Sequence, residues 1–172
     1  IHEAIPPDRN PGVITEPVQT LTDMRVIKNV SELVDTGDAD VTEETVTVED
    51  TRLRYLTGGD GETPLVLLHG GIIDAAYISW GELLGPLAKQ TRVYALNLPG
   101  YGGSELPEGP LSMDRHVEAV AGFIEQVGID DPVVAGTSMG GGAAIGLALS
   151  YPDRVSQVVA LEAFGLGTEL PS

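Results

Sequence analysis

The amino-acid sequence predicts an α/β fold: a mostly parallel, doubly wound sheet preceded by an antiparallel β-hairpin. Short, wholly apolar runs such as residues 65–68 alternate with longer segments of helical periodicity such as residues 111–127. Strands of that composition are covered by helices on both faces, which is typical of a parallel sheet. Before them, residues 45–49 and 52–57 alternate apolar with polar side chains around a short turn, as the strands of a half-buried hairpin do.

The expected elements follow one another from Val41 onward. A glycine-rich break at residues 58–61 ends the hairpin, because glycine clusters favour turns over strands. The later strands are predicted over residues 65–68, 92–96, 132–135 and 155–160. The helices are predicted over residues 80–89, 111–127 and 143–150, from apolar side chains at helical spacing.

Residues 1–40 are predicted to form an acidic, proline-containing arm, and residues 41–172 to form the α/β domain. Prolines and polar residues are frequent in the first part of the arm, which favours an extended or poorly ordered segment. Residues 31–50 hold eight carboxylates and no basic side chain, which we interpret as a solvated surface. The pair Asp38 and Asp40 lacks the rest of a calcium-loop pattern. We predict no metal site and no cofactor.

The net charge is −17, from 26 acidic and 9 basic residues. Such a surface repels phosphate, so the composition excludes a nucleic acid as a partner. Lysine is scarce, while valine, threonine, alanine and glycine are abundant. With the acidic surface, this indicates a salt-loving organism, because high salt screens the self-repulsion. The alternative is an ordinary acidic protein with an acidic tail.

Residues 1–7 lack the basic flank and apolar core of a signal peptide. No apolar stretch is long enough to cross a bilayer, and the chain has no cysteine, which excludes disulfides and thiolate metal sites. We therefore expect a cytoplasmic protein that acts on a small molecule and binds no membrane. Ile1 stands where a native chain would begin with methionine, so we expect a fragment or a processed product.

The segment Gly136-Thr137-Ser138-Met139-Gly140 joins a strand-like run to a helix-like run. A serine between two glycines at a sharp strand-to-helix turn is typical of a nucleophile elbow. The turn is so tight that the residues two before and two after the serine need to lack side chains, and the helix N-terminus points at the hydroxyl. A glycine-rich helix start with an incidental serine is the alternative. The context on both sides favours Ser138 as a nucleophile.

A second glycine-rich segment, His69-Gly70-Gly71-Ile72, follows the strand 65–68. A serine nucleophile needs backbone N–H donors aimed at the developing oxyanion, and glycine lets the backbone approach closely. The candidate donors are the amides of Gly71 and Met139. A plain strand-to-helix turn is the alternative. A third segment, LNLPGYGGS at residues 96–104, lies at the edge where open α/β sheets place ligands. A structural turn is the favoured interpretation, and a segment that lines the site is the alternative.

With the HGG loop, the LPGYGGS loop and the GTSMGG elbow in this order, the chain resembles the α/β-hydrolase superfamily over residues 41–172. Within it, the chain is similar to small ester hydrolases and to meta-cleavage product hydrolases, which cleave carbon–carbon bonds. The resemblance implies Ser138 as the nucleophile and the amides of Gly71 and Met139 as the oxyanion hole. Asn97 departs from the pattern, since the family often has aspartate before the LPG turn, but this position is not catalytic.

The sequence lacks the acid–base half of such a site. In this fold the chain order is serine, then aspartate or glutamate, then histidine, and no histidine follows Ser138. We place His2 in the arm, expect His69 to support the oxyanion loop, and interpret His116 as a surface residue of its helix. Three acids follow the serine: Asp153, interpreted as part of a turn, Glu162 at the end of the last strand, and Glu169.

The resemblance implies that a lid, two further core strands, the catalytic acid and the histidine follow residue 172. The chain is therefore expected to be the N-terminal half of a hydrolase, inactive without a complementary C-terminal segment or chain, with its strand 155–160 as an exposed apolar edge. The favoured function is hydrolysis of a carboxylic ester or related acyl substrate by Ser138. The alternatives are carbon–carbon bond hydrolysis on the same fold and a non-catalytic binding half-domain. Ile73, Tyr77 and Trp80 are expected in the core, and the alternative is that they line a pocket.

Overall fold

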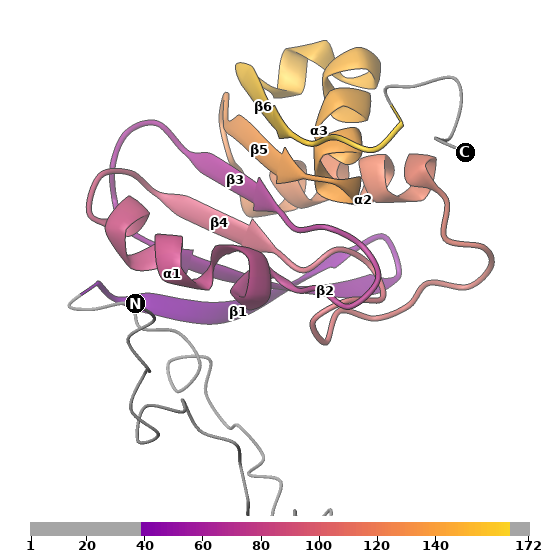
Figure 1. The fold of residues 1–172 in the computed structure, drawn as a ribbon, viewed down its shortest axis with the longest axis horizontal. Coiled ribbons are helices and arrows are strands. Elements are labelled where there is room, and N and C mark those ends of the chain that lie inside the picture. The colour runs from indigo at the N-terminus through magenta and orange to yellow at the C-terminus, as the bar shows by residue number, and fades with distance from the viewer. Residues whose placement is uncertain (1–38, 166–172) are drawn as a thin grey trace, which may run out of the picture.

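The computed structural model describes residues 39–165. A six-stranded sheet in the order β1-β2-β4-β3-β5-β6 runs through this part of the chain, and helices pack against it (Figure 1). Four strands are parallel: β3 (Leu65–Leu68), β4 (Val93–Leu96), β5 (Val133–Thr137) and β6 (Gln157–Leu161). The predicted α/β fold with a mostly parallel sheet is therefore confirmed.

The hairpin that precedes the parallel strands is formed by β1 (Val41–Val48) and β2 (Thr51–Gly58), which pair antiparallel. The strand β2 also pairs antiparallel with β4, so the hairpin continues the sheet. Its carboxylates lie at the surface, as predicted: Glu43 pairs with Arg54 at 3.4 Å and Glu44 accepts a hydrogen bond of 2.7 Å from the Tyr55 hydroxyl. The predicted arm lies almost entirely outside the described residues.

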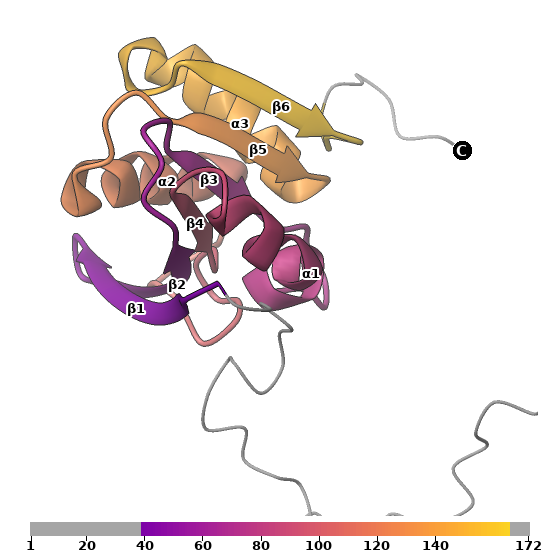
Figure 2. The ribbon, with the colours of Figure 1, turned by 90° about the vertical axis from the view of Figure 1, so that its left-hand side faces the viewer.

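Alternate residues of the central strands pack against helices on opposite faces of the sheet. Val66 and Leu68 belong to a core cluster with α2 (Met113–Val127) and α3 (Met139–Ser150). Leu67, between them, belongs to a second cluster with α1 (Ala76–Ala88). Figure 2, in which the molecule is turned by 90°, shows α1 and α2 on opposite sides of the sheet. Helices thus cover both faces of the sheet, and both faces of β3 are shielded from water.

The helix α1 begins at Ala76, earlier than the predicted start at residue 80. Two side chains satisfy backbone N–H groups at its beginning: Asp74 Oδ1 accepts from Ala75 at 2.7 Å, and Asn97 Oδ1 accepts from Ala76 at 2.8 Å. Side-chain oxygens at such positions stabilise a helix end. Because Asn97 belongs to the loop after β4, hydrophobic periodicity does not reveal this start.

The buried residues of α1 are Ala76, Trp80, Gly81, Leu84, Gly85 and Ala88. The prediction of a core position is confirmed for Trp80. It is wrong for Tyr77 and for Ile73, which is 88% exposed. Ile73 lies in the loop before the helix, and Tyr77 is 36% exposed although the glycines one and two turns further on, Gly81 and Gly85, are buried.

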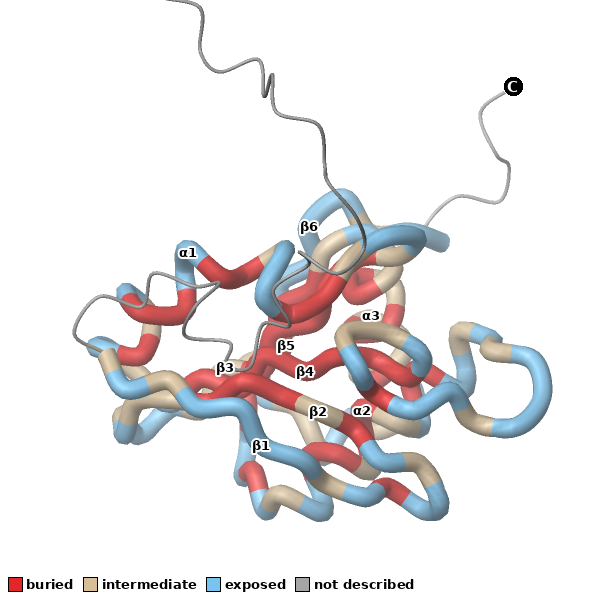
Figure 3. Tube along the Cα trace, turned by 90° about the horizontal axis from the view of Figure 1, so that it is seen from below, coloured by how far each residue is buried: buried red, intermediate tan, exposed pale blue. Residues whose placement is uncertain are grey.

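The strand β6 is an edge of the sheet, reached after the short 3-10 helix η3 (Pro152–Arg154). In Figure 3 the tube is mostly red along the central strands and mostly pale blue along β6. Val159 and Leu161 are large apolar side chains exposed on it, so the predicted exposed apolar edge is confirmed. No helix within residues 39–165 is long and apolar enough to cross a membrane.

Candidate active site

Ser138 lies between β5 and α3, with φ of 50° and ψ of −114°. Residues other than glycine rarely adopt a positive φ. The backbone around it is held from two sides: its N–H donates to the carbonyl oxygen of Leu161 at 2.9 Å, and its carbonyl oxygen accepts from Gly142 at 3.0 Å and Phe164 at 2.9 Å. The predicted sharp strand–turn–helix geometry is present, with Ser138 exposed at the carboxyl end of β5.

The glycines that flank the serine have no room for a side chain. A Cβ atom on Gly136 would collide with the carbonyl oxygen of Gly140, and one on Gly140 would collide with the carbonyl oxygen of Leu68. Both obstacles are backbone atoms, which cannot swing away as a flexible side chain would. Glycine is therefore required two residues before and two residues after Ser138, because α3 packs so closely against β3 and β5.

The loop after β3 is organised by one carboxylate. Asp74 Oδ2 accepts hydrogen bonds from the Gly70 N–H at 2.8 Å and from the Ser79 hydroxyl at 2.7 Å. The loop lies against the elbow: a Cβ on Gly70 would be 3.6 Å from Ser138 Cβ, and one on Gly71 would be 3.7 Å from Met139 Cβ. The structure thus brings the three predicted site residues, Ser138, Met139 and Gly71, together.

His69 holds this loop in place through hydrogen bonds of both its ring nitrogens. Its Nε2 accepts from the backbone N–H of Leu98 at 3.0 Å, and its Nδ1 lies 2.7 Å from the carbonyl oxygen of Gly70. Because an N–H can only donate, Nε2 is the acceptor and Nδ1 carries the proton. Burial lowers the pKa of His69 below its usual 6.5, which keeps this neutral tautomer. Both ring nitrogens are engaged, so His69 cannot serve Ser138 as a base, as the sequence predicted.

A cavity of about 450 Å³ opens beside Ser138. Five segments that are separated in the sequence contribute its walls. They are the elbow (Ser138, Met139), the loop after β3 (Gly71, Ile72), the LPGYGGS turn (Tyr101), the start of α2 (residues 111–113 and His116) and Phe164. In open α/β sheets ligands bind at the carboxyl ends of the strands, which is where this cavity lies.

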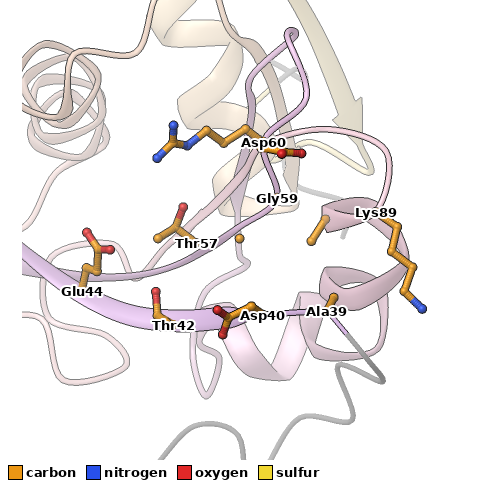
Figure 4. Close-up of a pocket in the computed structure, with 11 residues that line it drawn as sticks. Ala39, Asp40, Thr42, Glu44, Thr57, Gly59, Asp60 and Lys89 are labelled. Atoms are coloured by element: carbon orange, nitrogen blue, oxygen red, sulfur yellow. The ribbon is translucent and has the colours of Figure 1, made fainter.

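Another cavity, of about 410 Å³, lies at the opposite end of the parallel strands (Figure 4). Asp40, Glu44 and Asp60 line it together with Lys89 and Arg92. Arg92 immediately precedes β4, whereas Ser138 immediately follows β5. The strands β4, β3 and β5 are parallel neighbours, so this cavity is separated from Ser138 by the length of the sheet and takes no part in the candidate site.

A profile described as the alpha/beta hydrolase fold matches residues 63–171, more than half of the chain. The chain belongs to the α/β-hydrolase family. This agrees with the strand order, with the elbow and with the position of the cavity at the carboxyl end of β5.

Two of the proteins similar to this α/β-hydrolase chain are hydrolases. A 2-hydroxymuconate semialdehyde hydrolase from a Pseudomonas strain is 33% identical over 105 residues, covering 60% of this chain and 37% of that protein. The structure of a 2-hydroxy-6-oxo-6-phenylhexa-2,4-dienoate hydrolase from a Rhodococcus strain superposes with a TM-score of 0.71 at 27% identity, covering 77% of this chain and 50% of that one.

A relative of another kind is the dihydrolipoyllysine-residue acetyltransferase component of the acetoin cleaving system of Cupriavidus necator. It is 35% identical over 127 residues, which cover 73% of this chain and 33% of that protein. The α/β-hydrolase chain thus matches well under half of the length of this protein and of the 2-hydroxymuconate semialdehyde hydrolase.

The interpretation of His116 as a surface residue is wrong. It is only 3% exposed, and it lines the cavity beside Ser138. The helix α2 starts with its N-cap Ser112 at the cavity and turns His116 inward, toward the cluster formed with α3 and the sheet. The periodicity of α2 places residue 116 next to the buried Val117 and Val120, which is the signal that could have indicated burial.

The LPGYGGS segment is the structural turn that the sequence predicted, and it also contributes to the site. The Tyr101 ring packs against the His69 ring, with the centroids 5.1 Å apart and the planes tilted by 60°, and it lines the cavity. Asn97, the departure from the family pattern, is buried and fixes the start of α1. Phe164, which the sequence did not indicate, also lines the cavity, and its backbone N–H donates to the carbonyl oxygen of Ser138 at 2.9 Å.

The acids that follow the elbow do not complete a triad within the described residues. Asp153 is exposed in η3, and Glu162 is exposed after β6. Neither lines the cavity beside Ser138. Glu169 lies outside the described residues. Within residues 39–165 no three histidine, aspartate or glutamate side chains gather in a way that would hold a metal ion.

Proposed function

We propose that this chain carries the nucleophile and the oxyanion hole of a serine hydrolase that acts on a carboxylic ester or a related acyl substrate. The observation that supports this most is the strained elbow conformation of Ser138 at the mouth of a cavity that Gly71 and Met139 also line. A positive φ at a non-glycine residue is costly, of order 1–3 kcal/mol, and is retained at functional sites.

In the proposed reaction the Ser138 hydroxyl oxygen forms a bond to the carbonyl carbon while its proton passes to a histidine base. The carbonyl oxygen becomes an oxyanion that accepts hydrogen bonds from the backbone N–H groups of Gly71 and Met139. The N-terminus of α3 adds its favourable dipole. The leaving alcohol takes the proton as its bond to carbon breaks. Water, losing a proton to the base, then releases the acid and restores the hydroxyl.

The base and its acid are proposed to come from sequence beyond residue 172, as a continuation of the chain or as a complementary chain. Two of the three histidines of the sequence lie within the described residues, and neither suits the role. His69 has both ring nitrogens engaged. His116 has no carboxylate partner among the described residues to orient it, as a catalytic histidine requires. Residues 1–172 alone are expected to turn over little substrate.

A second candidate is hydrolysis of a carbon–carbon bond next to a carbonyl group. The similarity to 2-hydroxymuconate semialdehyde hydrolase and to 2-hydroxy-6-oxo-6-phenylhexa-2,4-dienoate hydrolase favours it. The same nucleophile and oxyanion hole would be used, and the leaving group would be a carbanion equivalent that is protonated on carbon. A panel of aryl esters and vinylogous 1,5-diketones separates the two, since an ester hydrolase cleaves only the former.

Labelling with an alkyl fluorophosphonate tests the proposed nucleophile. In the full natural chain we expect one phosphonate adduct, on the peptide that contains Ser138, and none in Ser138→Ala. Ser112→Ala is the matched control, because Ser112 lines the same cavity but its hydroxyl caps α2, so this variant is expected to label normally. A folded protein that stays unlabelled would favour a non-catalytic binding domain instead.

A further proposal concerns the acidic surface, which we infer is an adaptation to high salt. The net charge of −17 would destabilise a compact chain by self-repulsion at low ionic strength. The melting temperature, measured as a function of salt concentration, tests it.

A further inference from the structure

His116 is a buried polar side chain for which the proposed chemistry has no use. It projects from the first turns of α2 and is 3% exposed. Its Nδ1 has no hydrogen-bond partner among the described residues. A buried polar atom without a partner costs about 1–3 kcal/mol. An apolar residue at this position would avoid that cost.

The place of His116 suggests what it binds. It lines the cavity beside Ser138, where apolar side chains such as Ile72, Met113 and Phe164 form much of the wall. The imidazole Nδ1 is itself buried, and the described protein atoms leave it without a hydrogen-bond partner. A mostly apolar pocket with a few polar groups is how proteins orient and select small ligands.

Tyr101 extends this polar part of the wall. Its ring centroid lies 6.3 Å from that of His116 and 5.1 Å from that of His69. Its hydroxyl lies 3.9 Å from Met139 Sδ, and a thioether sulfur is only a weak acceptor. Tyr101 and His116 therefore form a polar strip on one wall, both with hydrogen-bonding capacity that the described part of the protein uses weakly or not at all.

The surroundings of His116 favour hydrogen bonding over proton transfer. No carboxylate is its partner in a hydrogen bond or ion pair among the described residues. Burial, and then the neighbouring His69, lower the pKa of His116 below its usual 6.5. The ring is thus neutral near pH 7 and offers one donor and one acceptor.

We propose that His116 is a specificity-determining residue that hydrogen-bonds a second oxygen-bearing group of the acyl substrate, besides the scissile carbonyl. This inference rests on the proposed function of Ser138. It implies that the protein discriminates against substrates whose acyl chain is only hydrocarbon, because these leave the imidazole buried and unpaired. A hydrogen bond of ordinary net strength corresponds to a preference of about tenfold.

Matched covalent probes test this. The reagents are an alkyl fluorophosphonate and a set of hydroxyalkyl fluorophosphonates of the same length, with the hydroxyl moved along the chain. A hydroxyl can both donate and accept, so it suits either tautomer of His116. The measured quantity is the second-order rate constant for labelling of Ser138 in the full natural chain. For one hydroxyl position we expect labelling about tenfold faster than with the alkyl probe.

The variants assign that preference to His116. His116→Phe keeps a flat ring but removes the hydrogen bond, so the tenfold preference should disappear while the alkyl probe still labels. His116→Gln restores a donor and an acceptor and should restore part of the preference. A purely structural role would change both rate constants together and leave their ratio unchanged.

Two labelling results would overturn the proposal, and a third would overturn the proposed function on which it rests. Labelling of the wild-type protein without preference at any hydroxyl position overturns it, as does an unchanged preference in His116→Phe. A folded protein that no probe labels at Ser138 overturns the proposed function itself. If no variant folds, the ¹⁵N chemical shifts of the wild-type His116 imidazole decide: they should differ between the hydroxyalkyl and alkyl adducts, and identical shifts overturn the proposal.

Discussion

The side-chain oxygen of Asn97 accepts a hydrogen bond of 2.8 Å from the backbone N–H of Ala76. This contact ties the loop after β4 to the first turn of α1. It also explains how asparagine replaces the aspartate that the family often has here, since both residues supply the accepting oxygen.

Removal of that oxygen is expected to destabilise the protein. Asn97→Ala leaves a buried N–H unpaired and should lower the free energy of unfolding by about 1–2 kcal/mol. Asn97→Asp is the control, because its carboxylate keeps the acceptor and faces the positive end of the α1 dipole. Urea denaturation measures both. Equal losses in the two variants would show that the contact is not a helix cap.

The turn around Ser138 is expected to reject any side chain at Gly140. In Gly140→Ala the new Cβ meets the backbone of β3, and overpacking of this kind costs about 3 kcal/mol. Gly146→Ala, in the same helix, is the control: its nearest obstacle is a methyl group of the Val117 side chain rather than backbone, and alanine gains about 1 kcal/mol in helix propensity. Chemical denaturation should rank Gly140→Ala well below Gly146→Ala, and the reverse ranking would contradict the proposed packing.

Stability is expected to depend on pH through His69. Its pKa in the folded protein lies below the ordinary 6.5, because it is buried, so the unfolded chain binds the proton first as the pH falls. The contribution of neutral His69 to the free energy of unfolding is therefore fully present above pH 6.5, and it is lost progressively as the pH falls below that value.

His69→Gln isolates this effect, since glutamine does not titrate while all carboxylates remain. Urea denaturation of both proteins at about pH 7.5 and 5.5 should show the stability advantage of the wild type shrinking at the lower pH. The same difference between the two proteins at both pH values would mean that His69 is not held neutral by burial.

The acidic surface predicts a melting temperature that rises with salt. Potassium chloride from low to molar concentration screens the repulsion among surface carboxylates, and the net charge of −17 makes this repulsion large. A scanning calorimetry series in KCl measures it. Equal melting temperatures at low and molar salt would favour an ordinary acidic protein.

Local signals in the sequence were sufficient for the elbow. The glycines around Ser138 are required by backbone atoms within the same turn and by the neighbouring strand, so their spacing alone indicates the geometry. The hairpin was predictable from the alternation of side chains in its strands, although the end of β2 is buried at successive residues, Tyr55 to Thr57.

Positions that depend on tertiary contacts were not predictable. The start of α1 is set by Asn97, which lies 21 positions further along the chain. The burial of His116 depends on where the first turn of α2 meets the cavity beside Ser138, and a single sequence gives no measure of that. A histidine on a helix is more often a surface residue, so the general tendency was misleading at this position.

The most direct test of the account is the mass of the acyl-enzyme. The full natural chain is mixed with an activated aryl ester, quenched in acid within milliseconds and digested for mass spectrometry. We predict one acyl adduct, on the peptide that contains Ser138, formed before steady-state turnover and absent in Ser138→Ala. Ester turnover that continues in Ser138→Ala, or an adduct on another residue, would contradict the assignment of Ser138 as the nucleophile.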